Sequence, residues 1–259
     1  MKTSENFKRL STERYGKTGF EYLDVYDIYT KEFCVRRNSM DETLLFTILK
    51  ENCYDPNMWF NRNLREEFVF ENVKCIVDAG ANIGVASCYF ANLFQNATVY
   101  SFEIEEDNFD LLCRNTRGYK NIIKNRTAIW KDNKGVYIGN RNSVIGHSGK
   151  VNPAKYEVVE DAIVNEERID SICISDFMVQ NNIDKIDILK MDIQGAEIEA
   201  FEDCERWLPK VRLLFIETHD LFRKGCSTKV FEMIAQYGKF AFIGSPNGDI
   251  LAFLREDEL

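Results

Sequence analysis

Short apolar runs alternate with amphipathic segments along the chain from Lys74 onward. Apolar runs bounded by turn-forming residues are typical of buried strands, and the amphipathic segments between them are typical of helices. This alternation predicts a doubly wound α/β fold with a seven-stranded, mostly parallel sheet. The predicted strands are CIVDAG, TVYSFE, NIIKNRTAIW, IDILKMD, LLFIETH, KFAFIG and DILAFLR. The predicted helices cover residues 85–94, 106–117, 196–207 and 228–237.

Both ends of the chain depart from this alternation. Only the turn residues PNGD, from Pro246 to Asp249, separate the last two strands, so we expect a C-terminal antiparallel hairpin that closes the sheet. Residues 1–70 are rich in aromatic and charged side chains and predict a small N-terminal cap or extension. Within this cap, YLDVYDIYTKEFCVR alternates like a short strand pair, and DETLLFTILKEN is predicted to form a helix capped by Asp41.

A second irregular segment covers residues 131–168, which carry Gly, Asn and Ser without clear periodicity. A stretch of this kind is typical of a loop or hairpin insertion over the edge of a sheet. We therefore expect residues 71–259 to form the main domain, with an insertion at about 131–168.

The composition limits the classes of function. The chain of 259 residues is 45% hydrophobic, which is enough for one large domain with a small extension. Its net charge of −9 argues against a nucleic-acid partner, because phosphate binding needs clustered Lys and Arg. No apolar run approaches the roughly 20 residues of a membrane span, and the N-terminus is polar, so we expect a cytoplasmic protein. The eight cysteines lack a C-x-x-C pair, which favours reduced thiols over disulfides or a zinc site.

The stretch CIVDAGANIGVASCYF contains a strand that ends at Asp78, a turn and the start of a helix. In an open parallel sheet the first turn of this kind is the favoured place for a ligand. Gly80 and Gly84 allow the tight turn and the close approach of a ligand to the backbone. Asn82 stands where the dinucleotide fingerprint G-x-G-x-x-G has its middle glycine, so a smaller and less anionic ligand is indicated.

An acidic residue, Glu103, ends the second predicted strand about 20 residues further on, where a carboxylate can accept hydrogen bonds from a ribose. A ribose without a pyrophosphate points to S-adenosylmethionine. Its amino-acid end would lie over DAGANIG, and its adenine would reach the end of the third strand near Thr127 and Ala128. The predicted cofactor-binding residues are Asp78, Gly80, Asn82, Gly84, Glu103 and Ala128.

Several motifs together resemble the FkbM family of S-adenosylmethionine-dependent methyltransferases. They are VDAGANIG, SFEIEEDNFDLLCRN, IDSICISDF, DILKMDIQGAEIEAF and LLFIETH, in the order and spacing of that family. The resemblance covers about residues 40–220. Two positions depart from the usual pattern, because Ile104 replaces a proline and Gln194 replaces a glutamate. The second change removes a charge beside the expected active site.

The resemblance implies a Rossmann-like class I methyltransferase that methylates a hydroxyl of a sugar, a glycan or another small-molecule natural product. Two alternatives stay open on the residues alone. A nicotinamide-dependent oxidoreductase would use the same turn and acidic residue, although the missing middle glycine speaks against it. A non-catalytic binding module that kept the fold would account for Gln194. The sequence favours no oligomeric state.

Candidate catalytic groups lie at the ends of the fourth and fifth predicted strands. The period of two places Lys190 and Asp192 on one face, and Glu217 and His219 on one face of the next strand. His219 is the predicted general base, because the ordinary pKa of imidazole lies nearest neutrality. Asp192 is the alternative base or a group that orients the acceptor. Lys190 is expected to pair with Glu217 or Asp192, and Glu197 is explained by the dipole of the following helix.

The sequence assigns no metal site. Asp192 and Glu217 could hold a hard cation together with water, but no acidic cluster has a recognisable metal-loop spacing. His147, in the glycine-rich insertion, is interpreted as a solvated loop residue.

Overall fold

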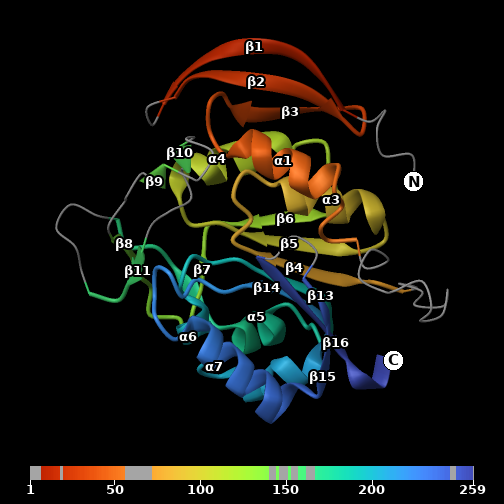
Figure 1. The fold of residues 1–259 in the computed structure, drawn as a ribbon, viewed down its shortest axis with the longest axis vertical. Helices are drawn as coiled ribbons and strands as arrows, with labels where there is room; N and C mark the ends of the chain where they lie inside the picture. The colour runs from red at the N-terminus through yellow and green to blue at the C-terminus, as the bar shows by residue number, and fades with distance from the viewer. Residues whose placement is uncertain are drawn as a thin grey trace.

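The computed structural model contains a central sheet of seven strands in the order β15-β16-β14-β13-β4-β5-β6 (Figure 1). It describes residues 7–17, 20–55, 72–139, 144–145, 151–152, 157–161, 167–245 and 249–258. The strands are β4 (Cys75–Ala79), β5 (Thr98–Phe102), β6 (Ile122–Asn125), β13 (Ile186–Met191), β14 (Val211–Glu217), β15 (Phe240–Gly244) and β16 (Ile250–Arg255). In this sheet β16 runs opposite to the other six strands and pairs antiparallel with both β14 and β15. The predicted mostly parallel α/β sheet and its C-terminal hairpin are therefore confirmed, although turn residues 246–248 lie outside the described part of the chain.

The strands contribute side chains to two apolar cores, because successive side chains point to opposite faces of the sheet. Ile76 and Ile188 belong to the core on one face, and their sequence neighbours Val77 and Leu189 belong to the core on the other. In Figure 1, helices α1, α3 and α4 lie over one face, whereas α5, α6 and α7 lie over the other. The helices are α1 (Asp41–Leu49), α3 (Val85–Leu93), α4 (Glu106–Asn115), α5 (Ile174–Gln180), α6 (Glu197–Ala200) and α7 (Cys226–Met233), the last continued by a π-turn, η3 (Ile234–Gly238).

Two predicted elements are broken in the structure. The run 121–130 is divided between β6 in the main sheet and β7 (Ala128–Ile129), which pairs with β12 (Ser171–Ile172) outside it. The helix predicted over 196–207 ends at Ala200 and gives way to the short 3₁₀ turns η1 (Cys204–Arg206) and η2 (Leu208–Lys210). The apolar side chains of this segment, such as Trp207, are buried nevertheless, so the spacing predicted their burial correctly although the helix is short.

The N-terminal segment forms an antiparallel sheet of three strands, β1 (Phe7–Lys17), β2 (Phe20–Ile28) and β3 (Lys31–Arg36). The predicted strand pair corresponds to β2 and β3. Prediction missed β1 because its side chains from Lys8 onward are mostly exposed and polar, which leaves no apolar alternation to detect. Figure 1 shows this sheet lying over α1, α3 and α4.

Three further short pieces complete the described chain. In the insertion, β8 (Tyr137–Gly139) pairs with β11 (Glu157–Val159), and β9 (Val144–Ile145) pairs with β10 (Val151–Asn152). A 3₁₀ turn, η4 (Glu256–Glu258), follows β16. His147 lies outside the described residues. None of the helices in the described ranges has the length and apolar character that crossing a membrane requires.

A buried ion pair fastens the N-terminal sheet to the main domain. The Arg36 guanidinium donates hydrogen bonds of 2.7 and 3.0 Å to the two oxygens of Asp41, and a third of 2.8 Å to the Asn108 side-chain oxygen in α4. Arg36 and Asp41 are both almost completely buried. The expected cap at Asp41 is therefore wrong, because this carboxylate pairs with Arg36 and Met40 occupies the cap position without a side-chain bond.

This pair allows a test of stability. Asp41→Ala should lower the free energy of unfolding by about 3–5 kcal/mol, because it leaves a buried guanidinium without its counter-charge. The double variant Arg36→Met/Asp41→Leu should lose less than this single variant, since it removes both charges. Asp110→Ala, which breaks the exposed pair with Lys17, is the matched control and should change stability little. Urea unfolding measures all three, and a double variant less stable than the single one would contradict the argument.

Candidate active site

The turn GANIG between β4 and α3 is shaped by close backbone contacts. Gly80 and Gly84 have left-handed φ angles of +78° and +90°. A Cβ atom on Gly80 would lie 1.7 Å from the backbone oxygen of Asp192, so the turn touches the end of β13 directly. A Cβ atom on Gly84 would lie 2.7 Å from the Leu112 side chain of α4. Gly84 therefore serves helix packing and is not among the residues that line the neighbouring cleft.

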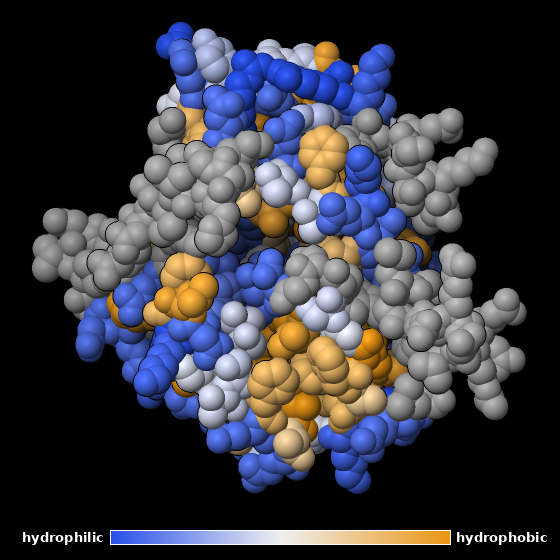
Figure 2. All heavy atoms as spheres, viewed as in Figure 1, coloured by the Kyte–Doolittle hydropathy of each residue, from blue (hydrophilic) through white to orange (hydrophobic). Residues whose placement is uncertain are grey.

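A cleft of about 440 Å³ lies beside this turn. Its walls come from α1 and the residues after it, from residues 80–86, and from the ends of β13 and β14. Figure 2 shows the molecule hollowed near the middle of this face, with hydrophilic residues along the rim. The polar and charged side chains that line the cleft include Glu51, Asn82, Lys190, Asp192, Gln194 and Glu217.

A second, narrower hollow of about 20 Å³ lies on the other side of Gly80. It is lined by the ends of β5 and β7, by Val158 of β11 and by Ile193. Glu103 and Ala128 both border it, so the structure brings together Gly80, Glu103 and Ala128 as the sequence predicted. Gly80 borders both hollows, and an elongated ligand could therefore pass over it from one to the other.

The Glu103 carboxylate holds the backbone around the narrow hollow. It accepts hydrogen bonds of 2.8 Å from the Asn82 amide, 2.9 Å from the Ile104 amide and 2.8 Å from the Glu105 amide. Through these bonds within the protein, Glu103 links the GANIG turn to the end of β5.

Asn82 presents a polar atom toward the cleft. Its φ angle is +51°, which asparagine tolerates better than most residues. Its side-chain oxygen is buried and accepts no hydrogen bond from the described part of the chain. Buried polar atoms are normally satisfied, so this oxygen is suited to a donor group of a ligand in the cleft.

Lys190 and Asp78 form a second buried ion pair beneath the cleft. The Lys190 ammonium lies 3.1 Å from an Asp78 oxygen and donates a hydrogen bond of 2.6 Å to the Gly80 carbonyl. Burial alone would lower the pKa of Lys190, but the Asp78 and Asp192 carboxylates outweigh burial and raise it. The other Asp78 oxygen accepts a bond from the Ser87 hydroxyl. Asp78 is fully buried and does not line the cleft, so its carboxylate acts on Lys190 and Ser87. Of the two partners expected for Lys190, Asp192 lies 4.0 Å away, but the closer partner is Asp78.

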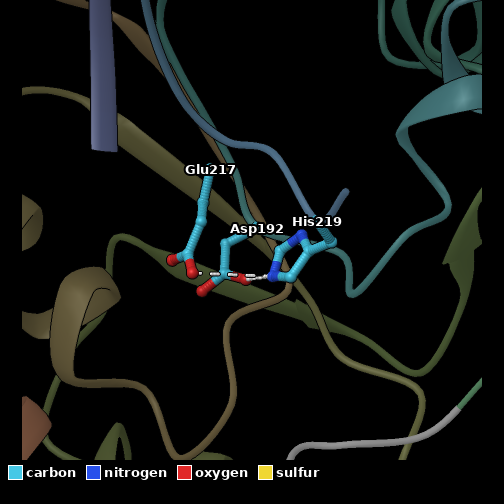
Figure 3. A group of neighbouring side chains, drawn as sticks. All are labelled: Asp192, Glu217 and His219. Carbon is cyan, nitrogen blue, oxygen red and sulfur yellow. Dashed lines mark ion pairs between the residues drawn. The ribbon is translucent and has the colours of Figure 1, made fainter. Parts of the chain in front are cut away.

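Asp192, Glu217 and His219 converge at the ends of β13 and β14, as Figure 3 shows. The His219 Nε2 atom lies 3.5 Å from Asp192 and 3.6 Å from Glu217. The other ring nitrogen, Nδ1, lies 2.9 Å from the Glu197 carboxylate and donates a hydrogen bond to it. Glu197 is completely buried. The sequence pattern gave Glu197 only a role at the helix end, because its contact with His219 spans 22 residues of chain.

The charges within this group shift the pKa values of His219 and Glu217. Burial would lower the pKa of His219, but Glu197, Asp192 and Glu217 raise it to about 9. The neighbouring Asp192 carboxylate and burial together raise the pKa of Glu217 to about 7. A raised pKa increases the protonated share of His219 at neutral pH, and its role as general base stays a prediction. Glu217 and Asp192 are the carboxylates of the group that face the cleft.

A family comparison agrees with this arrangement. The family model described as "Methyltransferase FkbM domain" matches residues 78–257. The chain belongs to the FkbM methyltransferase family. Methyltransferase 1 of Beauveria bassiana (strain ARSEF 2860) is 24% identical over 154 residues, which is 53% of this chain and 62% of that protein. Methyltransferase sdnD of Sordaria araneosa is 27% identical over 173 residues, which is 55% of this chain and 65% of that protein.

These matches span less than two thirds of each curated relative. The crystal structure of methyltransferase FkbM from Methylobacillus flagellatus KT is similar with a TM-score of 0.48 and 17% identity, over 70% of this chain and 43% of that one.

Gln194, the departure from the usual FkbM pattern, lies inside the group. Its side-chain nitrogen donates a hydrogen bond of 2.9 Å to Asp192 and lies 3.2 Å from the His219 Nε2 atom. Its φ angle is +57°. A glutamate at this place would add a further negative charge beside Asp192 and Glu217, so the glutamine lowers the charge repulsion in the site.

The contact between Gly80 and Asp192 gives a prediction. Gly80→Ala should lower the free energy of unfolding by about 3 kcal/mol more than Gly225→Ala, because its new Cβ atom meets backbone. Gly225 is the matched control, since its φ angle is +97° and a Cβ there meets nothing within 4 Å. Thermal and urea unfolding measure the difference, and equal losses would show that backbone strain alone explains Gly80.

Proposed function

We propose that this protein transfers a methyl group from S-adenosylmethionine to a hydroxyl group of a small-molecule or glycan acceptor. The observation that carries the proposal is the pair of hollows that meet at Gly80. One hollow has the Glu103 carboxylate and apolar walls, and the other has an acidic cluster and space for a second molecule. Membership in the FkbM family supports the same reaction.

The residues that line the two hollows fit such a donor. The orphaned Asn82 oxygen would accept a hydrogen bond from its ammonium group, and the Glu103 carboxylate, which borders the narrow hollow, would lie beside a ribose hydroxyl. The apolar hollow around Ala128 would take the adenine. This hollow is narrow, so Val158 and Ile193 on its walls must move outward to admit a base.

The protein's contribution to the reaction is chiefly alignment. S-adenosylmethionine supplies an electrophilic methyl group on a sulfonium, which leaves as a neutral thioether with the C–S electron pair when the acceptor oxygen bonds to the methyl carbon. Holding two reactants in line can account for several kcal/mol of the barrier. Asp192 and Glu217 face the cleft and would orient the acceptor hydroxyl and receive its proton.

The charge of the cleft also favours this donor over a dinucleotide. Glu51, Asp192 and Glu217 line the cleft, and the ammonium of Lys190 is already bound to Asp78 and to the Gly80 carbonyl. An acidic lining attracts a sulfonium and repels a pyrophosphate. The nicotinamide-dependent alternative therefore gains no support from the described residues of the site.

Donor binding can be tested with two asparagines that have the same backbone strain. Asn82→Ala should weaken the binding of S-adenosylmethionine by about tenfold, because it removes one hydrogen bond to a charged group. Asn182→Ala is the matched control, since Asn182 has a φ angle of +53° and is exposed elsewhere on the molecule. Isothermal titration calorimetry measures both affinities. Wild-type protein without affinity for the donor would refute the proposal.

Transfer itself can be tested with a methyl-labelled donor and a panel of sugars, lipids and peptides. Once an acceptor is found, Asp192→Asn should lower kcat by about tenfold or more with little effect on donor affinity, because the proton acceptor is lost. Glu51→Gln, which removes a carboxylate from the far wall of the same cleft, should leave kcat nearly unchanged. Donor binding without methylation of any acceptor would favour the non-catalytic binding module.

A further inference from the structure

We infer that the protein binds a divalent metal ion between Asp192, Glu217 and His219. The three side chains each offer one ligand atom, and these atoms all lie within 4.8 Å of one another. They come from two adjacent strands and point toward a common centre (Figure 3). Sequence spacing named Asp192 and Glu217 as possible holders of a cation but assigned no site, because Asp192 lies 25 residues before Glu217 and the three ligands share no local motif.

The distances within the group suit a shared ion once the Gln194 amide, which contacts both Asp192 Oδ1 and His219 Nε2, turns away from them. His219 Nε2 lies 3.5 Å from Asp192 Oδ1 and 3.6 Å from Glu217 Oε1. An N–H···O hydrogen bond is about 2.7–3.2 Å long, so both separations are longer than a normal hydrogen bond. Two ligands that each lie about 2.0–2.2 Å from one cation are separated by roughly 3–4 Å.

The second ring nitrogen of His219 gives an independent indication. A metal-bound histidine normally donates its other N–H to a carboxylate, which fixes the ring and directs its lone pair at the ion. Glu197 occupies this position at 2.9 Å from Nδ1, and it is fully buried. The His219 side chain is only 4% exposed, and its Nε2 atom is directed toward Asp192 and Glu217.

The charge around the group also calls for a cation. Asp192, Glu217 and Glu197 surround a single imidazole. The nearest other cation, Lys190, is 3.1 Å from Asp78 and 4.0 Å from Asp192, so most of its charge is already matched. Carboxylates that lie close together repel one another unless a positive charge balances them, and a divalent ion would neutralise two of these three.

The site is open on one side. Asp192 and Glu217 line the cleft with side chains that are 26% and 33% exposed, whereas His219 closes the inner side. Three protein ligands leave coordination positions for water or a further oxygen, as in catalytic metal sites. Two carboxylates and one imidazole suit Mn²⁺, Fe²⁺ or Zn²⁺ better than Mg²⁺, which prefers oxygen alone.

A cation at this place would change the acceptor chemistry, a consequence that rests on the proposed function. An acceptor hydroxyl bound to the ion would lose its proton more readily, because the positive charge stabilises the alkoxide. Asp192 and Glu217 each offer one oxygen to the ion, so the second oxygen of either carboxylate would receive the proton of the hydroxyl. Its position beside Gly80 and Asn82 sets the acceptor next to the proposed donor.

Binding of Mn²⁺ alone, without donor or acceptor, tests the inference by electron paramagnetic resonance. Wild-type protein should bind about one ion per chain saturably, and Asp192→Asn or Glu217→Gln should each weaken binding by about tenfold or more. Glu51→Gln is the matched control, because it removes the same charge from the same cleft outside the ligand set. Absence of saturable binding by the wild type, or equal weakening by Glu51→Gln, would overturn the site.

Two further readouts separate this site from general attraction of cations to an acidic cleft. Electron spin echo envelope modulation should show one nitrogen bound directly to Mn²⁺, and His219→Gln should abolish that signal. Glu197→Gln should weaken Mn²⁺ binding about tenfold although Glu197 is no ligand. A bound ion without a nitrogen ligand would refute the assignment. Mn²⁺ binding without donor binding would leave the site standing while the proposed function fails.

Discussion

The ion pair between Lys190 and Asp78 is the contact on which the geometry of the site depends. Both side chains are buried, and the ammonium also holds the Gly80 carbonyl, so the pair locks the end of β4, the GANIG turn and the end of β13 together. Losing one partner of such a pair costs about 3–5 kcal/mol, because the remaining charge is left in a medium of low dielectric. Asp192 follows β13 by one residue, so its position beside the turn is set by this lock.

The cleft is a product of both parts of the chain. Residues of α1 and the segment after it, including Thr43, Thr47 and Glu51, form one wall, and the strand ends form the other. Helix α1 is held by the Arg36–Asp41 pair, which joins it to the N-terminal sheet and to α4. The N-terminal sheet therefore stabilises a wall of the cleft without lining it. Acceptor shape should be controlled by α1, whereas the donor side is built by the main sheet.

Local sequence patterns were enough to predict most of the fold. Apolar runs predicted the sheet, and the signals of Gly80 and Glu103 predicted two residues that border one hollow, because strand ends meet at one edge of a parallel sheet. Strand β1 has no apolar alternation, and the single run 121–130 serves two sheets, so local pattern missed both. The protonation of His219 depends on three carboxylates from two strands and a helix start, which no local pattern reports.

The carboxylates of Glu197, Asp192 and Glu217 need a balancing positive charge whether or not the site holds a metal ion. With no ion, the proton on His219 neutralises part of the charge of Glu197, Asp192 and Glu217, which is why the pKa of the ring is raised to about 9. With an ion, the same Nε2 lone pair binds metal, and the proton and the cation compete for one position. Gln194 contacts both Asp192 and this nitrogen, so a neutral amide here limits the negative charge that either form must balance. A glutamate at this position would favour a divalent ion over a proton, because one more carboxylate would then face the same small volume.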